Sequence, residues 1–424
     1  MTGAQAAIGR LHGAYSARRH ANVAALVLGF GLGQGSLFLA QIWLAREGAL
    51  ARLAEFGIHF SFAILAMLLI EAGSVVTLAR RVALDPQEIW RPYWANVALR
   101  LTLAAGVALV FIGYALTTPD AFARGYCLAA APGLLLSAVS PAGLLDGLKR
   151  SGVSGLAAGL PHVFSAVAIF PTLDSGSFAA GAVLGTALTS SFLAAVLFQF
   201  FGLHAMGYRP AFRRPTGRDI RAAWGEGVAM LCVSMPGQIY FRLQILLCTA
   251  SLGAETAGLF IIAKQVVSAL SQLLVWARRA EFPQLVRTVH RERSFGFARL
   301  FAFERARIAL ALLIVVFVAA TSLVVSAVSD GGIVAAAKAT LFLSLYPLSI
   351  GVYASLTQLL FAQGRFQAAA FVFCSSAISG LLVCGVLVDH LGLLAFALGD
   401  LSDHLVGALF AALLLRAGMR RAVR

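Results

Sequence analysis

Two cations stand inside apolar stretches of this sequence, where an ionisable side chain needs a physical reason. Arg242 lies in the apolar run 226–250, and Lys264 lies in the next run, 257–277. A charge at the bilayer centre costs on the order of 2.5–3.5 kcal/mol by insertion scales. The two cations fall at similar depth on adjacent helices, so they repel unless an anion or a carboxylate lies between them. We therefore predict a water-filled anion-binding cavity; the alternatives are structural pairing with an acid, or snorkelling to the membrane surface.

Uncharged polar residues recur beside these cations at the spacing that puts residues on one helix face. The two polar stripes are Ser234, Gln238 and Arg242 on the first helix, and Lys264, Ser268, Ser271 and Gln272 on the second. Amide and hydroxyl groups can hydrogen-bond to a polar ligand. We predict that Gln238, Ser268 and Gln272 line the cavity.

A third polar stripe, Asp400, Asp403 and His404, lies near the middle of the last apolar run. Two interpretations stay open for it. The acids can pair with Arg242 or Lys264 as a structural salt bridge. Alternatively, the stripe can be a proton or cation site, which would couple transport to a proton or sodium gradient.

The first half of the chain has fewer polar residues of this kind. Glu71 is the only acid well inside its apolar runs, and Ser74 lies on the same helix face. Gln34 and Gln41 share a face of the first helix. We predict that Glu71 and Gln41 line a cavity in this half.

Motifs for other chemistries do not occur in the sequence. It contains no Walker sequence, no His-Glu-x-x-His and no Cys/His metal cluster, and its five cysteines all fall in apolar segments. We therefore predict neither an enzyme nor a bound cofactor or metal.

The composition requires lipid as the solvent over most of the surface. Of the 424 residues, 60% are hydrophobic and 12% are charged, whereas a soluble domain is usually about one quarter charged. The net charge of +15 does not indicate nucleic-acid binding. The basic residues occur in short runs between apolar stretches, as membrane topology places them.

Twelve apolar stretches reach the roughly 20 residues that a spanning helix needs. They lie at about 22–45, 57–79, 96–117, 123–146, 152–173, 177–202, 226–250, 257–277, 307–329, 338–361, 368–388 and 392–415. This pattern predicts an all-α polytopic membrane protein, because an outer-membrane barrel would show short alternating strands. Prolines are expected to kink three of the helices, at Pro132, Pro141, Pro236 and Pro347.

The basic residues predict the orientation of the chain. With the N-terminus in the cytoplasm, nearly all Lys and Arg fall on the cytoplasmic side, and the other side holds only Arg46, Arg52, Arg124 and Lys338. Positive residues mark cytoplasmic loops, so both termini should be cytoplasmic. The expected parts are an N-terminus 1–21, a six-helix lobe 22–202, a basic linker 203–225, a second six-helix lobe 226–415 and a C-terminus 416–424.

One phrase occurs twice in the chain, 198 residues apart. Residues 79–87 read ARRVALDPQ and residues 277–284 read ARRAEFPQ, and each follows the second helix of its lobe. Parallel repeats imply two bundles related by an axis along the membrane normal, with a transport site between them. We interpret the arginine pairs of the phrase as cytoplasmic anchors, and we assign Arg100 and Asp146 to the membrane interface.

Several segments resemble one known family. ALARLAEFGIHFSFAILAMLLIEAGSVVTLARRVA at 49–83, SPAGLLDGLKRSG at 140–152, SLGAETAGLFIIAKQV at 251–266 and FPQLVR at 282–287 are similar to the polysaccharide exporter (Wzx-type flippase) branch of the multidrug/oligosaccharidyl-lipid/polysaccharide (MOP) superfamily. The resemblance implies a MATE/MOP-like fold of two six-helix lobes. It also implies an activity: moving an undecaprenyl-diphosphate-linked oligosaccharide from the inner to the outer leaflet of the bacterial inner membrane.

The resemblance also implies partners: the lipid-linked oligosaccharide, membrane lipids, and the polysaccharide polymerase and export machinery, with no nucleic acid. A drug or metabolite exporter of the same superfamily is the main alternative. Such exporters handle organic cations, which a cavity marked by Arg242 and Lys264 would repel. A polysaccharide polymerase or ligase is a weaker alternative because of its need for a large outer loop.

Overall fold

The computed structural model describes residues 3–47, 49–292, 296–328 and 332–423, and the regular elements in these ranges are all helices. The chain divides into two compact units. Unit 1 comprises Met1–Gly227 and Arg279–Pro283, and unit 2 comprises Val228–Arg278 and Gln284–Arg424. Most of unit 1 comes from the first half of the sequence, but a short segment of the second half belongs to it.

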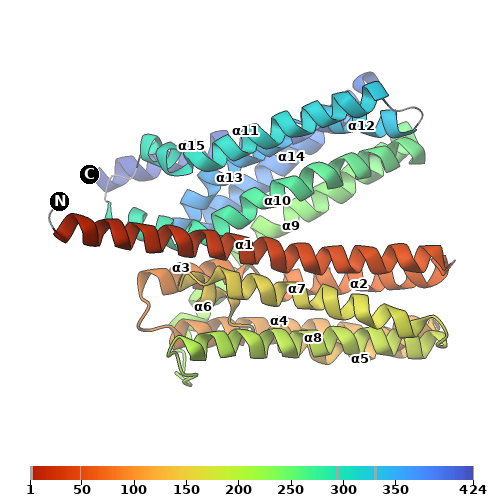
Figure 1. The fold of residues 1–424 in the computed structure, drawn as a ribbon, viewed down its shortest axis with the longest axis horizontal. Helices are drawn as coiled ribbons and strands as arrows, with labels where there is room; N and C mark the ends of the chain where they lie inside the picture. Colours follow the sequence, from red (N-terminus) through yellow and green to blue (C-terminus); the bar gives the residue numbers. More distant parts are fainter. Residues whose placement is uncertain (1–2, 48, 293–295, 329–331, 424) are drawn as a thin grey trace. The chain divides into compact units, whose positions relative to one another are not determined.

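Figure 1 shows the helices in chain order. Unit 1 holds α1 (Gly3–Arg46), α2 (Leu50–Glu71), α3 (Ser74–Leu84), α4 (Trp90–Thr117), α5 (Ala121–Ser137), α6 (Ala142–Gly147), α7 (Ser151–Ile169), η1 (Phe170–Thr172), α8 (Ser177–Ala205), the start of α9 (Gly217–Leu252) and part of α10 (Ala254–Arg291). Unit 2 holds the rest of α9 and α10, then α11 (Phe297–Val328), α12 (Gly332–Phe342), α13 (Tyr346–Ala362), α14 (Phe366–Leu391) and α15 (Leu393–Val423).

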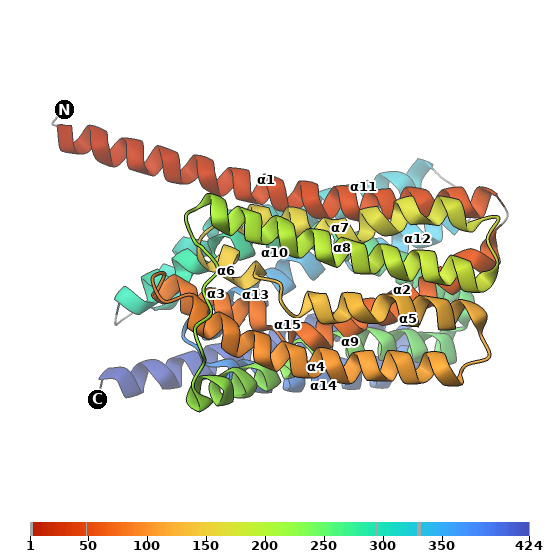
Figure 2. The same ribbon diagram turned by 90° about the horizontal axis from the view of Figure 1, so that it is seen from below.

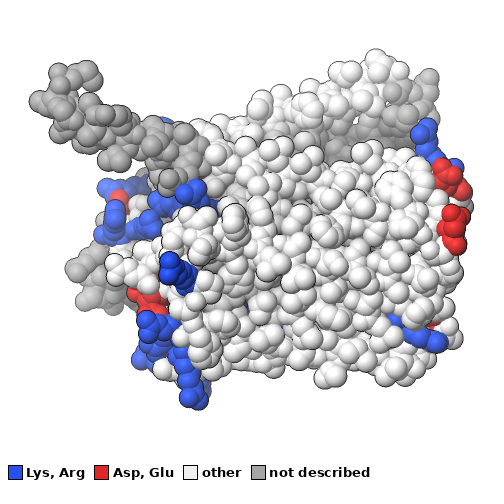
Figure 3. Space-filling model, turned by 60° about the horizontal axis from the view of Figure 1, so that its bottom comes forward, with Lys and Arg blue, Asp and Glu red and all other residues white. Residues whose placement is uncertain are grey.

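Twelve spans in the described residues are long and apolar enough to cross a membrane, which confirms the predicted all-α polytopic fold. On the face drawn in Figure 3, charged side chains gather toward the two ends of the helices, and the flank between them is uncharged. Hydrocarbon can cover such a flank, and helices satisfy their own backbone groups within it.

Several helices extend well beyond their predicted ends. The eighth span was expected to end at residue 277, but α10 continues to Arg291. This extension buries an apolar stripe of Phe282, Leu285 and Val286, and such a stripe stabilises a helix whose other face is polar. The expected loop 278–306 is therefore largely helical. The expected linker 203–225 likewise shortens, because α9 already begins at Gly217.

Three spans are broken into two helices. The second consists of α2 and α3, the fourth of α5 and α6, and the tenth of α12 and α13. Pro141 and Pro347 stand at the start of the second piece in the fourth and tenth spans, where proline lacks the amide that would continue the hydrogen-bond ladder. Pro132 and Pro236 lie inside continuous helices instead.

The break in the second span depends on backbone conformation rather than on proline. Ala72 and Gly73 both have positive φ angles, of 45° and 59°. Glycine adopts this left-handed region readily, and alanine does so only at a cost. Glu71 is therefore the last residue of α2, and Ser74 is the first residue of α3.

Small residues allow close helix packing within unit 1. α1 packs along α7, and a Cβ added at Gly33 would lie 2.8 Å from the carbonyl oxygen of Gly159. α5 and α8 also pack along each other, with Gly125, Gly181 and Gly185 in the contact. Without a hydrophobic drive between helices in lipid, such close approach is a main source of association.

Candidate functional site

A polar cavity of about 400 Å³ lies in unit 2. It brings together predicted residues from α9, α10 and α15: Gln238, Lys264, Ser268, Gln272, Asp400, Asp403 and His404. Their side chains converge although 136 residues separate Lys264 from Asp400. Each of the three polar stripes therefore contributes residues to one cavity.

Lys264 and Asp400 form an ion pair in this cavity. Both side chains are buried, and the Gln244 amide nitrogen donates to the second carboxylate oxygen of Asp400 at 3.1 Å. The Lys264 ammonium also lies 4.4 Å from the ring centroid of Tyr346, a cation–π contact. Of the three sequence interpretations of Lys264, the structure supports pairing with an acid, so the charge of Lys264 is cancelled locally.

Arg242 has a different environment from the one the sequence suggested. Its side chain is exposed and donates to the backbone and side-chain oxygens of Gln238, one turn earlier on α9, at 3.0 and 3.2 Å. It does not line the cavity, although Gln238 does. Arg242 and Lys264 therefore do not face each other across an anion, because Asp400 of α15 already occupies the place beside Lys264.

The other two members of the third stripe differ in their contacts. His404 is buried, its Nδ1 lies 2.8 Å from the Ser349 hydroxyl, and its ring lies against those of Tyr346 and Tyr353. Asp403 is half-buried and lines the cavity. Among the described residues, no Lys or Arg forms an ion pair with Asp403.

Sequence reasoning missed the aromatic part of this cavity. Tyr240, Tyr346 and Tyr353 line it together with Gln265. Tyrosine within an apolar helix is common at membrane interfaces, so its type alone gave no signal. These tyrosines lie at a similar depth along their helices to Lys264 and Asp403, and this shared depth could have indicated that they line the same cavity.

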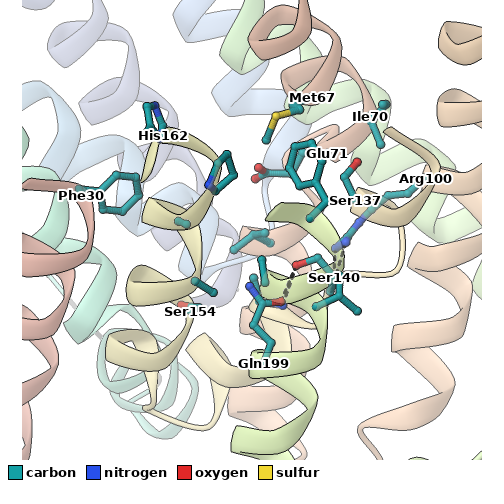
Figure 4. Close-up of a pocket in the computed structure, with 18 of the residues that line it drawn as sticks. Phe30, Met67, Ile70, Glu71, Arg100, Ser137, Ser140, Ser154, His162 and Gln199 are labelled. Carbon is teal, nitrogen blue, oxygen red and sulfur yellow. Dashed lines mark hydrogen bonds between the residues drawn. The ribbon is translucent and has the colours of Figure 1, made fainter. Parts of the chain in front are cut away.

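A second polar cavity, of about 270 Å³, lies in unit 1 (Figure 4). Glu71 contributes its carboxylate from the break between α2 and α3, as predicted from the sequence, and it is joined by Ser137, Ser140, His162 and Gln199. The side chain of Glu71 is exposed, and no residue in the described ranges forms an ion pair with it.

The predicted companion of Glu71, Gln41, is not among the residues that line this cavity. α1 contributes Phe30 instead. At 1.5 Å per residue, Gln41 lies roughly 16 Å further along the same helix. A shared helix face does not fix the depth of a residue along the helix.

Arg100 holds the broken helices of unit 1 together. It is buried, donates through Nε to the Ser74 hydroxyl at 2.6 Å, and donates to the carbonyl oxygen of Ser140 at 2.8 and 3.1 Å. The Tyr93 hydroxyl donates to the neighbouring carbonyl oxygen of Val139 at 2.6 Å. The sequence analysis assigned Arg100 to the membrane interface. In the structure its side chain is buried inside unit 1, where it satisfies carbonyl groups that the break between α5 and α6 leaves free.

The two arginines of the second repeat phrase, Arg278 and Arg279, lie against acidic side chains, which corrects their interpretation as simple anchors. Arg279 Nε donates to an Asp146 carboxylate oxygen at 2.7 Å, and its Nη2 donates to the Ser154 hydroxyl at 3.1 Å. Arg278 donates to the carbonyl oxygen of Gly351 at 2.6 Å and lies 3.7 Å from Glu304. These cations are fixed by acids that lie far away in the sequence.

Comparison with known proteins adds the family. The family described as "Polysaccharide biosynthesis protein" matches residues 20–289, which is more than half of the chain. The chain belongs to this polysaccharide biosynthesis protein family. The family match covers most of unit 1, all of α9 and nearly all of α10, and so includes Gln238, Arg242 and Lys264. A search of curated proteins gave no match.

Solved structures of MATE transporters share the fold. A MATE protein in the bent conformation is similar with a TM-score of 0.77 and 14% identity, over 96% of this chain and 97% of that one. An outward-facing multidrug resistance MATE transporter of the MOP superfamily gives 0.72 and 16%, over 96% of both chains. A MOP superfamily transporter from Pyrococcus furiosus gives 0.67 and 16%, again over 96% of both chains. The polysaccharide biosynthesis protein described here is a multi-pass membrane protein with a MATE-like fold.

Proposed function

We propose that this protein is a transporter, and not an enzyme, that flips an undecaprenyl-diphosphate-linked oligosaccharide from the inner to the outer leaflet of the bacterial inner membrane. The family supports a role in polysaccharide biosynthesis, and the MATE-like fold supports alternating access between two six-helix lobes, 22–202 and 226–415. The predominance of basic residues on one set of loops supports an orientation with both termini in the cytoplasm.

The observation that carries the proposal is Arg242. It is exposed, lies roughly 15 Å along α9 from Leu252, and forms no ion pair with any described residue. An exposed cation at that depth is costly in hydrocarbon unless water or an anion reaches it. A diphosphate that enters the membrane-spanning region is such an anion.

The polar cavities support sugar binding next to that charge. Gln238 connects the proposed sugar site with the proposed anion site, because it lines the unit 2 cavity and accepts a hydrogen bond from Arg242. Ser268 and Gln272 offer further hydrogen-bonding groups to sugar hydroxyls in the same cavity, and Glu71 offers a carboxylate in the cavity of unit 1. Lys264 acts here as half of a neutral pair with Asp400 rather than as a second anion site.

Coupling to a proton or sodium gradient is part of the proposal. Asp403 is the acid best placed for it, since it faces the cavity without a cationic partner among the described residues. Asp400 is neutralised by Lys264, and His404 is held by Ser349. The transported lipid, the surrounding lipids and the polymerase and export machinery are the proposed partners.

The first test is deletion of the gene, followed by mass spectrometry of lipid-linked sugars and measurement of surface polysaccharide. We expect undecaprenyl-diphosphate-linked oligosaccharide to accumulate and the matching surface glycan to be lost. An unchanged lipid pool together with new sensitivity to cationic dyes would instead support a drug exporter. The Pyrococcus furiosus transporter is described as having a binding pocket of reversed polarity that suggests a different function, and Arg242 supports a cationic site here.

Charge reversal at Arg242 tests the proposed anion site directly. Arg242→Glu should abolish complementation of the deletion strain, because a carboxylate would repel the diphosphate. Arg218→Glu, on an exposed arginine near the start of the same helix, is the matched control and should complement. Membrane levels of both variants are measured by immunoblot, and normal export by Arg242→Glu would rule out the anion site.

A further inference from the structure

The segment 206–216 joins α8 to α9 without forming a helix, yet it is fixed against unit 1. Figure 2 shows it running from the end of α8, past the end of α4, to the start of α9. The indole nitrogen of Trp94 on α4 donates to the carbonyl oxygen of Ala211 at 2.9 Å. Tyr208 and Ala211 pack against a buried cluster that includes Tyr93. The side chains of this segment therefore project from a backbone that is held in place.

Five arginines of the expected linker 203–225 are exposed, and none of them forms an ion pair with a described residue. They are Arg209, Arg213, Arg214, Arg218 and Arg221. The one acid of the linker is Asp219, and Arg91 already donates to it from Nε at 2.8 Å. Like charges that lie close together repel one another. An anion from outside the protein would therefore stabilise this part of unit 1.

A large apolar side chain lies among these arginines. Phe212 directly precedes Arg213 and is 73% exposed, and its ring centroid lies 5.3 Å from that of Trp94. A phenylalanine ring gains free energy when it leaves water, and tryptophan is enriched where a bilayer meets water. An exposed ring beside arginines therefore suits the boundary between hydrocarbon and lipid headgroups better than bulk water.

The end of α8 shows the depth at which this segment lies. Leu193, Leu197 and Phe201 are exposed and follow one another at four-residue spacing, so they form one apolar stripe on a membrane-spanning helix. Hydrocarbon covers such a stripe. From Phe201 to Ala205, the last residue of α8, the helix rises by roughly 6 Å. The segment 206–216 therefore lies just beyond the hydrocarbon, at the level of the lipid headgroups.

We propose that Arg209, Arg213 and Arg214, with the ring of Phe212, form a binding site for the phosphate group of an anionic phospholipid such as phosphatidylglycerol. Guanidinium groups bind phosphate oxygens through charge-assisted hydrogen bonds, and basic residues next to a span attract anionic lipids. A zwitterionic lipid carries an ammonium group, which these arginines repel. The exposed ring and the headgroup level of the segment favour a lipid over an acidic soluble protein. This inference does not depend on which lipid-linked substrate the protein moves.

Two pairs of exposed arginines provide matched variants. Arg213→Gln with Arg214→Gln removes two charges from the proposed site. Arg291→Gln with Arg305→Gln removes two charges from exposed positions of α10 and α11 and is the control. Phe212→Ser removes the ring and keeps every arginine. All of these side chains are exposed, so the variants should fold, and size-exclusion chromatography in detergent checks that they do.

The experiment uses the purified full-length protein in nanodiscs of phosphatidylcholine. A small fraction of the lipid is phosphatidylglycerol or phosphatidylcholine with a photoreactive group at the start of one acyl chain, and mass spectrometry locates the labelled peptides. We expect phosphatidylglycerol to label the segment 206–216 about tenfold more than phosphatidylcholine does. The double arginine variant should lower this labelling by about 20-fold at low salt, since each arginine contributes roughly fivefold to the binding of an anionic lipid. Phe212→Ser should lower it by about fivefold, and the control pair should stay within about twofold of the wild type.

The outcomes separate the phospholipid from other anions. Equal labelling by the two lipids, or undiminished labelling of the double arginine variant, would overturn the site. Displacement of the label by millimolar inorganic phosphate would overturn the lipid assignment in favour of free phosphate. Stronger displacement by undecaprenyl diphosphate than by unlabelled phosphatidylglycerol would assign the arginines to the transported lipid instead. A protein that phosphatidylglycerol does not label, but that binds a polyglutamate peptide, would point to an acidic protein partner and would also overturn the proposal.

Discussion

At the scale of single residues, the environment of a charge decides its role more than its type does. Lys264 and Arg242 look alike in the sequence, yet Lys264 is buried against Asp400 and Arg242 is exposed beside Gln238. A buried charge without a partner is strongly unfavourable, whereas a pair with further hydrogen bonds is tolerated. Lys264 therefore contributes to the stability of unit 2, and Arg242 remains available to a ligand.

The Lys264–Asp400 pair gives a stability prediction. Lys264→Met leaves the buried Asp400 carboxylate without its cation, although Gln244 still donates to it, and should lower the free energy of unfolding by about 3–5 kcal/mol. Lys264→Met combined with Asp400→Leu removes both charges and should recover most of this loss. Unfolding of the purified protein in detergent measures the effect, with Lys338→Met, on an exposed lysine, as the control. A single variant as stable as the wild type would contradict the pairing.

At the scale of elements, breaks in the spans place the polar groups of unit 1. The α2–α3 break ends a helix at Glu71, and the α5–α6 break frees the carbonyl groups that Arg100 and Tyr93 bind. The equivalent position in the second repeat, 198 residues after Gly73, is Ser271, and α10 continues through it. Glycine adopts the left-handed conformation readily, whereas serine favours continuation of the helix. The break of the second span is therefore not repeated in the equivalent helix of the second half, α10.

The conformation of Gly73 can be tested directly. Gly73→Ala places a Cβ at a φ of 59° and should lower stability by about 1–2 kcal/mol. Gly57→Ala, in the body of α2 where a Cβ meets no atom within 4 Å, is the control and should be neutral or slightly stabilising. Thermal unfolding in detergent compares the two variants, and equal stability would argue against a strained break.

A second element-scale prediction concerns the segment of α10 that belongs to unit 1. Arg279→Glu would face Asp146 with a like charge and should lower both stability, by about 1–3 kcal/mol, and export. Adding Asp146→Arg reverses the pair and should restore part of both. Arg305→Glu, on an exposed arginine of α11, is the control. Failure of the double variant to improve on the single one would mean that the ion pair is not the cause.

At the scale of the whole molecule, the twelve candidate spans among the described residues predict that both termini lie on one side of the membrane, and the basic loops predict that this side is the cytoplasm. Fluorescent protein fused after residue 424 or inserted at residue 150 should fluoresce, while alkaline phosphatase inserted at residue 119 or 175 should be active. Activity of a phosphatase fusion at residue 150 would reverse the orientation and the proposed direction of transport.

The sequence alone determined the number of spans, the repeat and the stripes of polar residues, because each of these is a local pattern of hydrophobicity or helical periodicity. It placed Gln238, Ser268 and Gln272 on faces that line a predicted cavity and Asp403 and His404 on a third polar stripe, and the structure joins all five in one cavity. It did not determine that α10 and α11 extend through the expected loop. Charged residues are typical of a solvent-exposed loop, and the burial of one of them, Glu304, depends on tertiary packing.

Only the tertiary structure decided which charges meet. Lys264 finds Asp400, Arg279 finds Asp146, and Arg100 finds a carbonyl of a broken helix, each across a long stretch of chain. Helical periodicity fixes the face of a residue but not the partner that packs against that face. The cost of an unpaired charge in a low-dielectric interior selects these partners, and that cost acts only once the helices have packed.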